Sequence, residues 1–326
     1  IQELILKIKP EIIICNDLDF HPDHIMTSIL FEKALGKILK SNKEYRPIVL
    51  KGFTYENCYF GPDDLFEQEN EMKFQKDKSG KLISNQYYNI QDSLKINISP
   101  KCYTQNLFAN KIFKAILKHK SQNLVSHTTR MINTNQVYWK RNTDNLLFNA
   151  QIETSSGNKE YLNDFSLSDT DYILNGNKVP IKYNQGIWIP DNDDNEKRIT
   201  ITFDNKEYVE CIKLYNGLIN KNYIKEIEIK LDNKKAEKYT LEDKLINSIS
   251  IKANVEKIEI KVIDDKCSNG FSEIEAFSKP ENSTKENEAK IKNNTNILTK
   301  IIDKGMISLL TFTQKVYRKL FIKSKF

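Results

Sequence analysis

Apolar and polar residues alternate between residues 150 and 277, and this period of two most constrains the fold. In "RITITFD" the apolar positions are Ile199, Ile201 and Phe203. The segments "KEIEIKLD" (225–232) and "KIEIKVID" (257–264) repeat the pattern. Successive side chains of a strand point to opposite faces, so each segment would bury one face and expose the other. Short strands of this kind, separated by Asn, Asp and Gly turns, predict an all-β sandwich or jelly roll.

The N-terminal residues have a different pattern, with helical spacing on either side of a short apolar run. "IQELILKI" has apolar residues on one helical face, and Pro10 ends that helix. "EIIIC" (11–15) is typical of a strand in a covered parallel sheet. "HIMTSILFEKALGKIL" (24–39) predicts a second helix, and "YRPIVLKGFTY" (45–55) predicts a second strand. This order is typical of part of a doubly wound, Rossmann-like α/β fold.

The length of 326 residues favours more than one domain. We expect an α/β domain at 1–150, the β-sandwich at 151–278, and a polar linker with a basic helical tail at 279–326. A further helix is predicted at about 104–120, inside the first domain. The five cysteines contain no CxxC pair, which favours a reducing compartment and hence a cytoplasmic location.

The segment HPDH at 21–24 places two of the four histidines of the chain directly after the apolar strand. In open α/β sheets, ligands bind at the carboxyl ends of strands, where this segment is expected. Histidine is a common zinc ligand, and a neighbouring carboxylate can orient it for proton transfer. The simpler interpretation is a polar loop in which Asp23 caps the following helix. The position and the scarcity of histidine favour the chemical interpretation.

The segment "IKPEIIICNDLDFHPDHIMTSIL" (8–30) resembles the second signature of the PIG-L/LmbE-type zinc-dependent N-deacetylases. "KIFKAILKHKSQ" (111–122) is similar to a later helix of that family, and the resemblance covers about residues 1–150. It implies that His24 is a ligand of a Zn²⁺ cofactor. It also implies that His21 transfers a proton or stabilises an oxyanion, with Asp23 orienting it. The implied reaction removes N-acetyl groups from amino sugars of a glycan or glycolipid.

The first signature of that family, HPDD followed by an acidic residue, is missing from the chain. It supplies the remaining zinc ligands and the general base, and a catalytic zinc normally has three protein ligands. Asp63 and Asp64, in "FGPDDLF", lack the preceding histidine. The chain starts inside a helical pattern and without Met, so we expect an N-terminally truncated sequence that is inactive as it stands.

The β-rich region resembles galactose-binding-like (discoidin, F5–8 type C) jelly rolls. The resemblance rests chiefly on "GIWIPD" (186–191), "VECIKLYNG" (209–217) and "NGFSEIEAF" (269–277). Such domains often bind glycans through aromatic rings and polar groups. Trp188 and Tyr215 are candidates, although each lies in a predicted strand, which favours burial. Asp191, Asp193 and Asp194 form either a calcium site or, as we favour, a solvated acidic turn.

The whole net charge of +6 resides in the C-terminal tail. Residues 297–326 contain seven basic residues and one acidic residue, which leaves 43 of each among the rest. The body therefore gives no argument for nucleic-acid binding. As a helix interrupted at Gly305, the tail would place apolar residues beside Lys and Arg. It then either lies on an anionic membrane surface, at the inner membrane face, or packs against this protein or a partner.

Taken together, the two resemblances imply an enzyme, a zinc-dependent N-deacetylase represented by part of its catalytic domain and followed by a carbohydrate-binding-like sandwich. The expected partner is an N-acetylated amino sugar, glycan or glycolipid, and not a nucleic acid. The alternative is a non-catalytic carbohydrate-binding protein whose deacetylase part has lost its chemistry.

Overall fold

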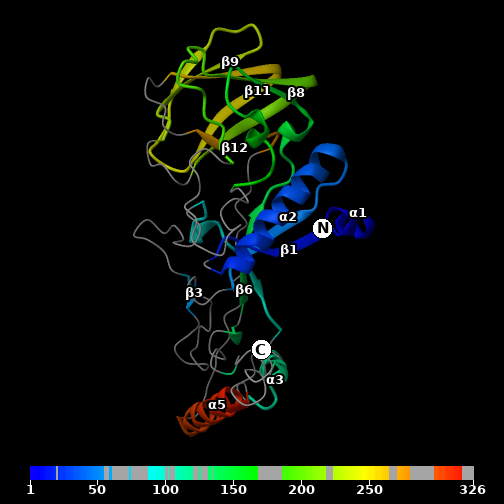
Figure 1. The fold of residues 1–326 in the computed structure, drawn as a ribbon, viewed down its shortest axis with the longest axis vertical. Helices are drawn as coiled ribbons and strands as arrows, with labels where there is room; N and C mark the ends of the chain where they lie inside the picture. The colour runs from blue at the N-terminus through cyan, green and yellow to red at the C-terminus, as the bar shows by residue number, and fades with distance from the viewer. Residues whose placement is uncertain are drawn as a thin grey trace. The chain divides into compact units, whose positions relative to one another are not determined.

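The protein is largely β-sheet with few helices (Figure 1). A computed structural model describes residues 1–19, 21–54, 59–60, 73–74, 87–99, 102, 107–119, 125, 131–133, 135–167, 186–217, 223–263, 270–279 and 297–317. Asp63, Asp64 and most of the predicted linker lie outside these residues.

The chain divides into two compact units that alternate along the sequence. Unit 1 comprises Ile1–Gly52, Asn85–Tyr87 and Lys140–Ser283. Unit 2 comprises Phe53–Ser84, Tyr88–Trp139 and Thr284–Phe326. The predicted domain boundary near residue 150 falls inside unit 1, because the α/β segment at the N-terminus belongs with the β-rich region.

Unit 1 begins with the elements α1 (Gln2–Ile8), β1 (Ile12–Asn16), α2 (Pro22–Ser41) and β2 (Ile48–Gly52). β1 and β2 pair in parallel, with Ile12 opposite Ile48. The buried side of α2, including Leu35, packs into a core with Val49 and Phe165. The predicted order of helix, strand, helix and strand is confirmed. Among the described residues, the parallel pair of β1 and β2 does not by itself show the α/β domain of a deacetylase.

The HPDH segment forms the cap and first turn of α2. His21 is the N-cap residue, and its Nδ1 accepts a hydrogen bond of 3.2 Å from the Asp23 backbone N–H. Pro22 follows at the first helical position, where the lack of an N–H costs nothing. The simpler interpretation from the sequence, with Asp23 as the cap, is wrong by two residues, because the imidazole accepts the bond expected of a carboxylate.

The β-rich part of unit 1 is an antiparallel sheet in the order β10–β9–β11–β8–β12, and β7 also pairs with β8 (Figure 1). The strands are β7 (Gln151–Thr154), β8 (Arg198–Asn216), β9 (Glu226–Leu231), β10 (Glu237–Thr240), β11 (Ile246–Val262) and β12 (Phe271–Phe277). Ile199, Ile201 and Phe203 are buried, and their polar neighbours in sequence are more exposed. The alternation predicted from the sequence is therefore confirmed.

The two longest strands, β8 and β11, pair with each other along most of their length, and each also pairs with a further strand. β9 pairs with the C-terminal half of β11, whereas β12 pairs with the C-terminal half of β8. The pairing of β8 and β11 shifts register twice, between Ser250 and Ala253 and between Val255 and Lys257. Such irregularities bend strands. One hydrophobic core collects Ile201 and Ile258 from one end with Leu214 and Ile274 from the other, as expected of a sheet bent around its core.

The remaining elements are short apart from the C-terminal helix. β5 (Leu94–Asn97) pairs antiparallel with β6 (Asn135–Arg141), whose last two residues belong to unit 1. In unit 2, β3 (Tyr59–Phe60) pairs with β4 (Lys73–Phe74). The described helices of unit 2 are α3 (Lys111–Lys118) and α5 (Ile297–Tyr317), with a short 3-10 turn at Ile90–Asp92. Unit 1 has short 3-10 turns at Leu146–Asn149 and Lys159–Leu162. Among the described residues, none of the helices is long and apolar enough to cross a bilayer.

Two predictions about unit 2 need correction. The helix predicted at 104–120 begins only at Lys111, because the Asn110 side chain accepts a hydrogen bond of 2.9 Å from the Phe113 N–H and caps it. The C-terminal helix is continuous through Gly305, where an interruption was predicted. Trp139 in β6 is buried.

Candidate functional site

The two histidines of HPDH meet a single buried carboxylate at the end of β1. Asp19 Oδ2 lies 2.7 Å from His24 Nδ1. The other oxygen of Asp19 accepts a hydrogen bond of 2.9 Å from the His21 backbone N–H. The imidazole rings lie 4.6 Å apart between centroids. The structure thus brings His21 and His24 together and adds Asp19, a residue that the sequence reasoning missed.

Asp23 occupies a different environment from the one its predicted role requires. Its side chain is 89% exposed, and its Oδ2 lies 3.9 Å from His21 Nδ1, longer than a hydrogen bond. The carboxylate that orients a histidine in this geometry is that of Asp19, and the histidine is His24. The signal for Asp19 in the sequence was its place in the polar loop "NDLDF" just before HPDH.

These residues fit a zinc ion only in part. A carboxylate that accepts a hydrogen bond from Nδ1–H leaves the lone pair on Nε2, which is the usual arrangement behind a zinc-bound histidine. A catalytic zinc normally has three protein ligands. Within the part of the chain that the structure describes, no three His, Cys, Asp or Glu residues are grouped to hold a metal ion. His24 with Asp19 supplies one oriented ligand and not a complete set.

Cys15 lies in β1, close to this segment. Burial raises the pKa of its thiol from 9.0 to about 11. The thiolate is the nucleophilic form of cysteine, and a raised pKa makes it scarce at neutral pH. Cys15 packs beside the core of α2, which favours a structural role over a nucleophilic one.

A network of buried charges lies behind the histidine segment. Lys51 is fully buried, and its Nζ donates hydrogen bonds to Ser28 Oγ at 2.6 Å and to Glu32 Oε1 at 3.0 Å. Asp17 Oδ1 lies 3.6 Å from the same ammonium group. Arg141 Nη1 donates to Glu32 Oε1 at 3.3 Å. The network therefore connects β1, α2 and β2 to the strand that leads into the β-rich region.

The network continues into β12, whose acidic residues point inward. Tyr215 donates a hydrogen bond of 2.5 Å to Glu275 Oε2, and the Phe165 N–H donates one of 3.2 Å to Glu273 Oε2. Burial, together with the nearby Asp164 and Glu275 carboxylates, raises the pKa of Glu273 well above its ordinary value. Its contacts are all internal, which favours a structural role.

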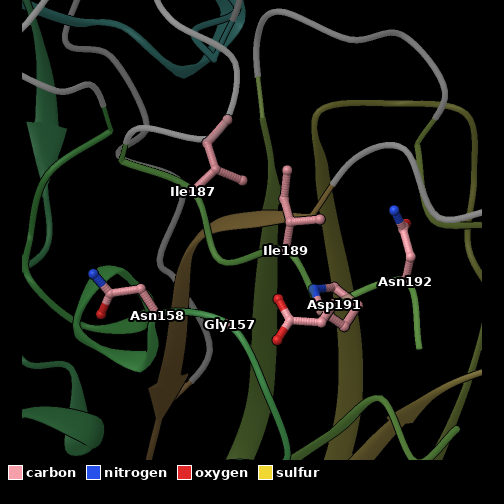
Figure 2. Close-up of a pocket in the computed structure, with 7 residues that line it drawn as sticks. Gly157, Asn158, Ile187, Ile189, Asp191 and Asn192 are labelled. Carbon is pink, nitrogen blue, oxygen red and sulfur yellow. The ribbon is translucent and has the colours of Figure 1, made fainter. Parts of the chain in front are cut away.

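A pocket of about 300 Å³ opens beside the β-rich core of unit 1 (Figure 2). Two chain segments line it, the turn after β7 and the segment before β8. The lining residues are Gly157, Asn158, Ile187, Ile189, Pro190, Asp191 and Asn192. Figure 2 shows the polar side chains of Asn158, Asp191 and Asn192 and the apolar side chains of Ile187 and Ile189. The pocket therefore combines hydrogen-bonding groups with an apolar wall.

Hydrogen bonds between the two segments hold the pocket walls in place. Trp188 Nε1 donates to Ser156 O at 2.8 Å, and the Asp191 N–H donates to Ser156 Oγ at 2.9 Å. The Ser155 and Ser156 hydroxyls each donate to Asp194 Oδ2 at 2.5 Å. Ser156 is thus bonded to three residues of the facing segment. Such a frame keeps a binding site formed before its ligand arrives.

Asp194 is the anchor of this frame. Burial by itself would raise the pKa of this carboxyl, but hydrogen bonds from Ser155, Ser156 and the backbone of Lys197 and Glu196 hold it well below its usual range. Its oxygens are therefore engaged within the protein. The sequence favoured a solvated acidic turn over a calcium site, and the structure shows that the Asp194 carboxylate of this turn is bonded within the protein.

Gly157 allows the two segments to approach closely. Its φ is +75°, and a Cβ at this position would lie 2.4 Å from Ile189 O. Any other residue would therefore be strained and would push the facing wall outward. The pocket depends on glycine at this position.

The predicted aromatic candidates do not line the pocket. Trp188 is fully buried and stacks on Phe271, with the ring centroids 6.1 Å apart. Tyr215 is buried against Glu275. Burial of both was the favoured prediction, and it is confirmed. Asn158 and Asn192 were missed, and their only signal was the turn-like composition of "SSGNKE" and "PDNDDN".

Comparisons with known proteins bear mainly on the β-rich region. A scan against models of protein families gave no match, and no curated protein matches the sequence. Neither result supports the deacetylase resemblance of residues 1–150.

Several solved structures are similar to part of the chain. A family 32 carbohydrate-binding module from Clostridium perfringens NanJ, in complex with galactose, is 15% identical and matches with a TM-score of 0.29; the match covers 40% of this chain and 95% of the module. A fucose-binding module from Streptococcus pneumoniae is 14% identical with a TM-score of 0.31, covering 42% and 98%. The lectin-binding domain of Lectinolysin complexed with Lewis b is 15% identical with a TM-score of 0.32, covering 42% and 96%. At TM-scores of this size the similarity assigns no ligand to this chain.

Proposed function

We propose that the chain is a carbohydrate-binding protein and that its sugar sits in the pocket of Asn158, Asp191 and Asn192. This is the non-catalytic alternative raised by the sequence. The observation that supports it is a pocket with three polar side chains and an apolar wall, on a frame of hydrogen bonds. Amides both donate and accept hydrogen bonds, and a carboxylate accepts them, so together they suit neighbouring hydroxyl groups. Ile189 and Pro190 suit the C–H surface of a sugar ring.

The expected affinity is weak, because the site offers no aromatic platform among its described lining residues. A monosaccharide of about 12 heavy atoms at about 0.3 kcal/mol per atom would bind with roughly 4 kcal/mol, which is a Kd of about 1 mM. Longer glycans would add contacts on both sides of the pocket. The first sugars to test are galactose, fucose and N-acetylglucosamine, which occur in the names of the similar structures.

Isothermal titration calorimetry of the full chain with these sugars and their short glycans tests the proposal. Asp191→Asn is expected to weaken binding about tenfold, because hydrogen bonds to a charged acceptor contribute more than those to a neutral one. Asp193→Asn is the matched control, since Asp193 is exposed in the same turn without lining the pocket. Equal affinities of the two variants, or no binding of any sugar by the parent chain, would contradict the proposal.

We infer a second candidate function for residues 1–150, a zinc-dependent amide hydrolase of which this chain holds only part. The pair of Asp19 and His24 favours it, because the pair resembles a metal ligand with its orienting carboxylate. The reaction would hydrolyse an N-acetyl group on an amino sugar to acetate and a free amine. Zinc, when bound, would polarise the amide carbonyl and activate a water molecule. His24 would bind the metal, and His21 would exchange a proton with the reacting groups.

Zinc titration and an acetate assay test this second candidate separately. The chain is expected to bind zinc weakly and to release no acetate from N-acetylglucosamine substrates. His24→Ala should abolish the zinc binding, whereas His119→Ala, at the end of α3, should leave it intact. Zinc binding that survives the loss of His24 would contradict the role of this histidine. Robust acetate release would contradict the incomplete ligand set.

A further inference from the structure

The C-terminal helix α5 exposes a stripe of large apolar side chains. Leu309 is 63% exposed, Phe312 is 65% exposed and Val316 is 39% exposed. Residues at positions i, i+3 and i+7 lie along one face of an α-helix, so these three form a continuous line. We call them the apolar stripe. Large contiguous patches of exposed apolar surface on a protein often mark sites of interaction with other proteins or with membranes.

A different set of α5 residues already packs inside unit 2. Met306, Ile307 and Leu310 contact the core formed by Leu107, Phe113 and Ile132. In a helix each residue turns by about 100°, which places Leu310 well away from Leu309 and Phe312 around the axis. The helix is therefore attached through one face, and the apolar stripe projects from another. Among the described residues of unit 2, the core that contacts α5 touches the first face and does not include the stripe.

The segment that contains the stripe also contains the net charge of the protein. Residues 297–326 hold seven basic residues against Asp303 alone, and the rest of the sequence is balanced. Lys315 is exposed and follows Phe312 by three residues, so its ammonium group lies beside the stripe. The last residues, "YRKLFIKSKF", add further basic and apolar residues. The expected occupant therefore has both apolar and anionic parts.

We propose that the apolar stripe of α5 docks this protein onto an anionic lipid surface. The acyl boundary of a bilayer accepts leucine, phenylalanine and valine side chains, while anionic headgroups attract the basic residues beside them. A nucleic acid would satisfy the charge but would leave the stripe in water. A second copy of the chain would cover the stripe but would bring two tails of charge +6 together, which is unfavourable.

Vesicle flotation of the full chain tests the proposal. The vesicles contain phosphatidylcholine alone or mixed with phosphatidylserine. The parent chain is expected to float with the anionic vesicles, to stay behind with the neutral ones, and to bind less as the salt concentration rises. The double variant Leu309→Ser, Phe312→Ser should lower the partition coefficient about tenfold or more, because it removes two of the inserted side chains.

The control variant is Ser308→Ala, Thr313→Ala, which changes two exposed residues of the same helix outside the stripe. It should float like the parent chain. Circular dichroism without vesicles shows whether each variant keeps its helix content; if the double variant loses it, Phe312→Ser alone serves in its place.

Three results would overturn the proposal. The first is equal flotation of the stripe variant and the control. The second is a concentration-dependent dimer that the stripe variant loses, with no vesicle binding by the parent chain, which would identify a second copy as the occupant. The third is binding to a DNA duplex that is unchanged in the stripe variant, again without vesicle binding.

Discussion

Asp19 and His24 are joined by a contact of 2.7 Å between Oδ2 and Nδ1. A carboxylate accepts a hydrogen bond, so this contact places the ring hydrogen of neutral His24 on Nδ1 and the lone pair on Nε2. In free histidine the tautomer with the hydrogen on Nε2 prevails. The pair therefore prepares His24 to act through Nε2, whether its partner is a metal ion or a proton.

The tautomer of His24 gives the first prediction. Long-range ¹H–¹⁵N correlation spectra are expected to show the hydrogen of neutral His24 on Nδ1. Asp19→Asn should shift the population towards Nε2–H, because the anionic acceptor is gone. Asp23→Asn should leave it unchanged, since the Asp23 side chain is mostly exposed. A parent chain with the hydrogen on Nε2 would contradict the geometry.

The buried ammonium of Lys51 gives the second prediction. Lys51→Met removes the cation that Glu32 and Asp17 face. Breaking a buried ion pair by deleting one partner typically costs about 3–5 kcal/mol, because a charge is left uncompensated. Urea unfolding should therefore show a loss of this size. Lys37→Met, at an exposed position of α2, is the control and should cost little. Similar midpoints for both variants would show that the network does not stabilise unit 1.

The carboxyl of Asp164 gives the third prediction, on pH. Burial raises its pKa from 3.8 to about 7. The folded protein then keeps this proton where the unfolded chain has released it, so this stability is present below about pH 4 and is lost as the pH rises to about 7.

The variant Asp164→Asn isolates this effect from the other carboxylates. In the parent chain the unfolding free energy should fall between about pH 4 and pH 7, and in the variant this fall should be smaller by roughly 1–2 kcal/mol. This is less than the full pKa shift would give, because Asp164 keeps some exposure to solvent. Asp204→Asn is the control, since the Asp204 side chain is 73% exposed. The prediction fails if both variants follow the parent curve of unfolding free energy against pH.

The packing of α2 gives the fourth prediction. A Cβ at Gly36 would lie 1.9 Å from Asp164 O, a backbone atom of the segment that packs against the helix. Gly36→Ala gains about 1 kcal/mol of helix propensity but must displace that backbone, at a cost of about 1–3 kcal/mol or more. Thermal unfolding should therefore show a net loss of stability. Lys37→Ala, next in the helix and exposed, should not lower it.

Much of the fold could be predicted from local patterns. β8, β9 and β11 each bury one face, so alternation in the sequence marks them directly. The order of α1, β1, α2 and β2 followed from Pro10 and from the change between helical and strand spacing. These signals lie within single elements, which is why one sequence suffices to identify them.

The candidate site could not be predicted in the same way, because its residues are held by contacts between segments that are distant in sequence. All seven residues of β12 are buried, although "FSEIEAF" alternates like a half-exposed strand. Its acids Glu273 and Glu275 are buried because β12 meets Phe165, Tyr215 and Arg141, which are distant in sequence. The pairing of Asp19 with His24 likewise depends on the turn between β1 and α2.

The pocket is equally non-local. Ser156 and Asp191 are 35 residues apart, and their hydrogen bond helps to set the distance between the walls. Turn-like composition predicted loops at both places, but not that the two loops face each other.

The most direct test of the account is a ¹H–¹⁵N NMR titration of the full chain with galactose, fucose and N-acetylglucosamine. The account predicts saturable shifts at the amides of Gly157, Asn158 and Asn192 for at least one of these sugars, with smaller shifts at the amides around His24. Saturable shifts confined to residues outside the pocket, or none with any sugar or short glycan, would contradict the assignment of this pocket as the carbohydrate site.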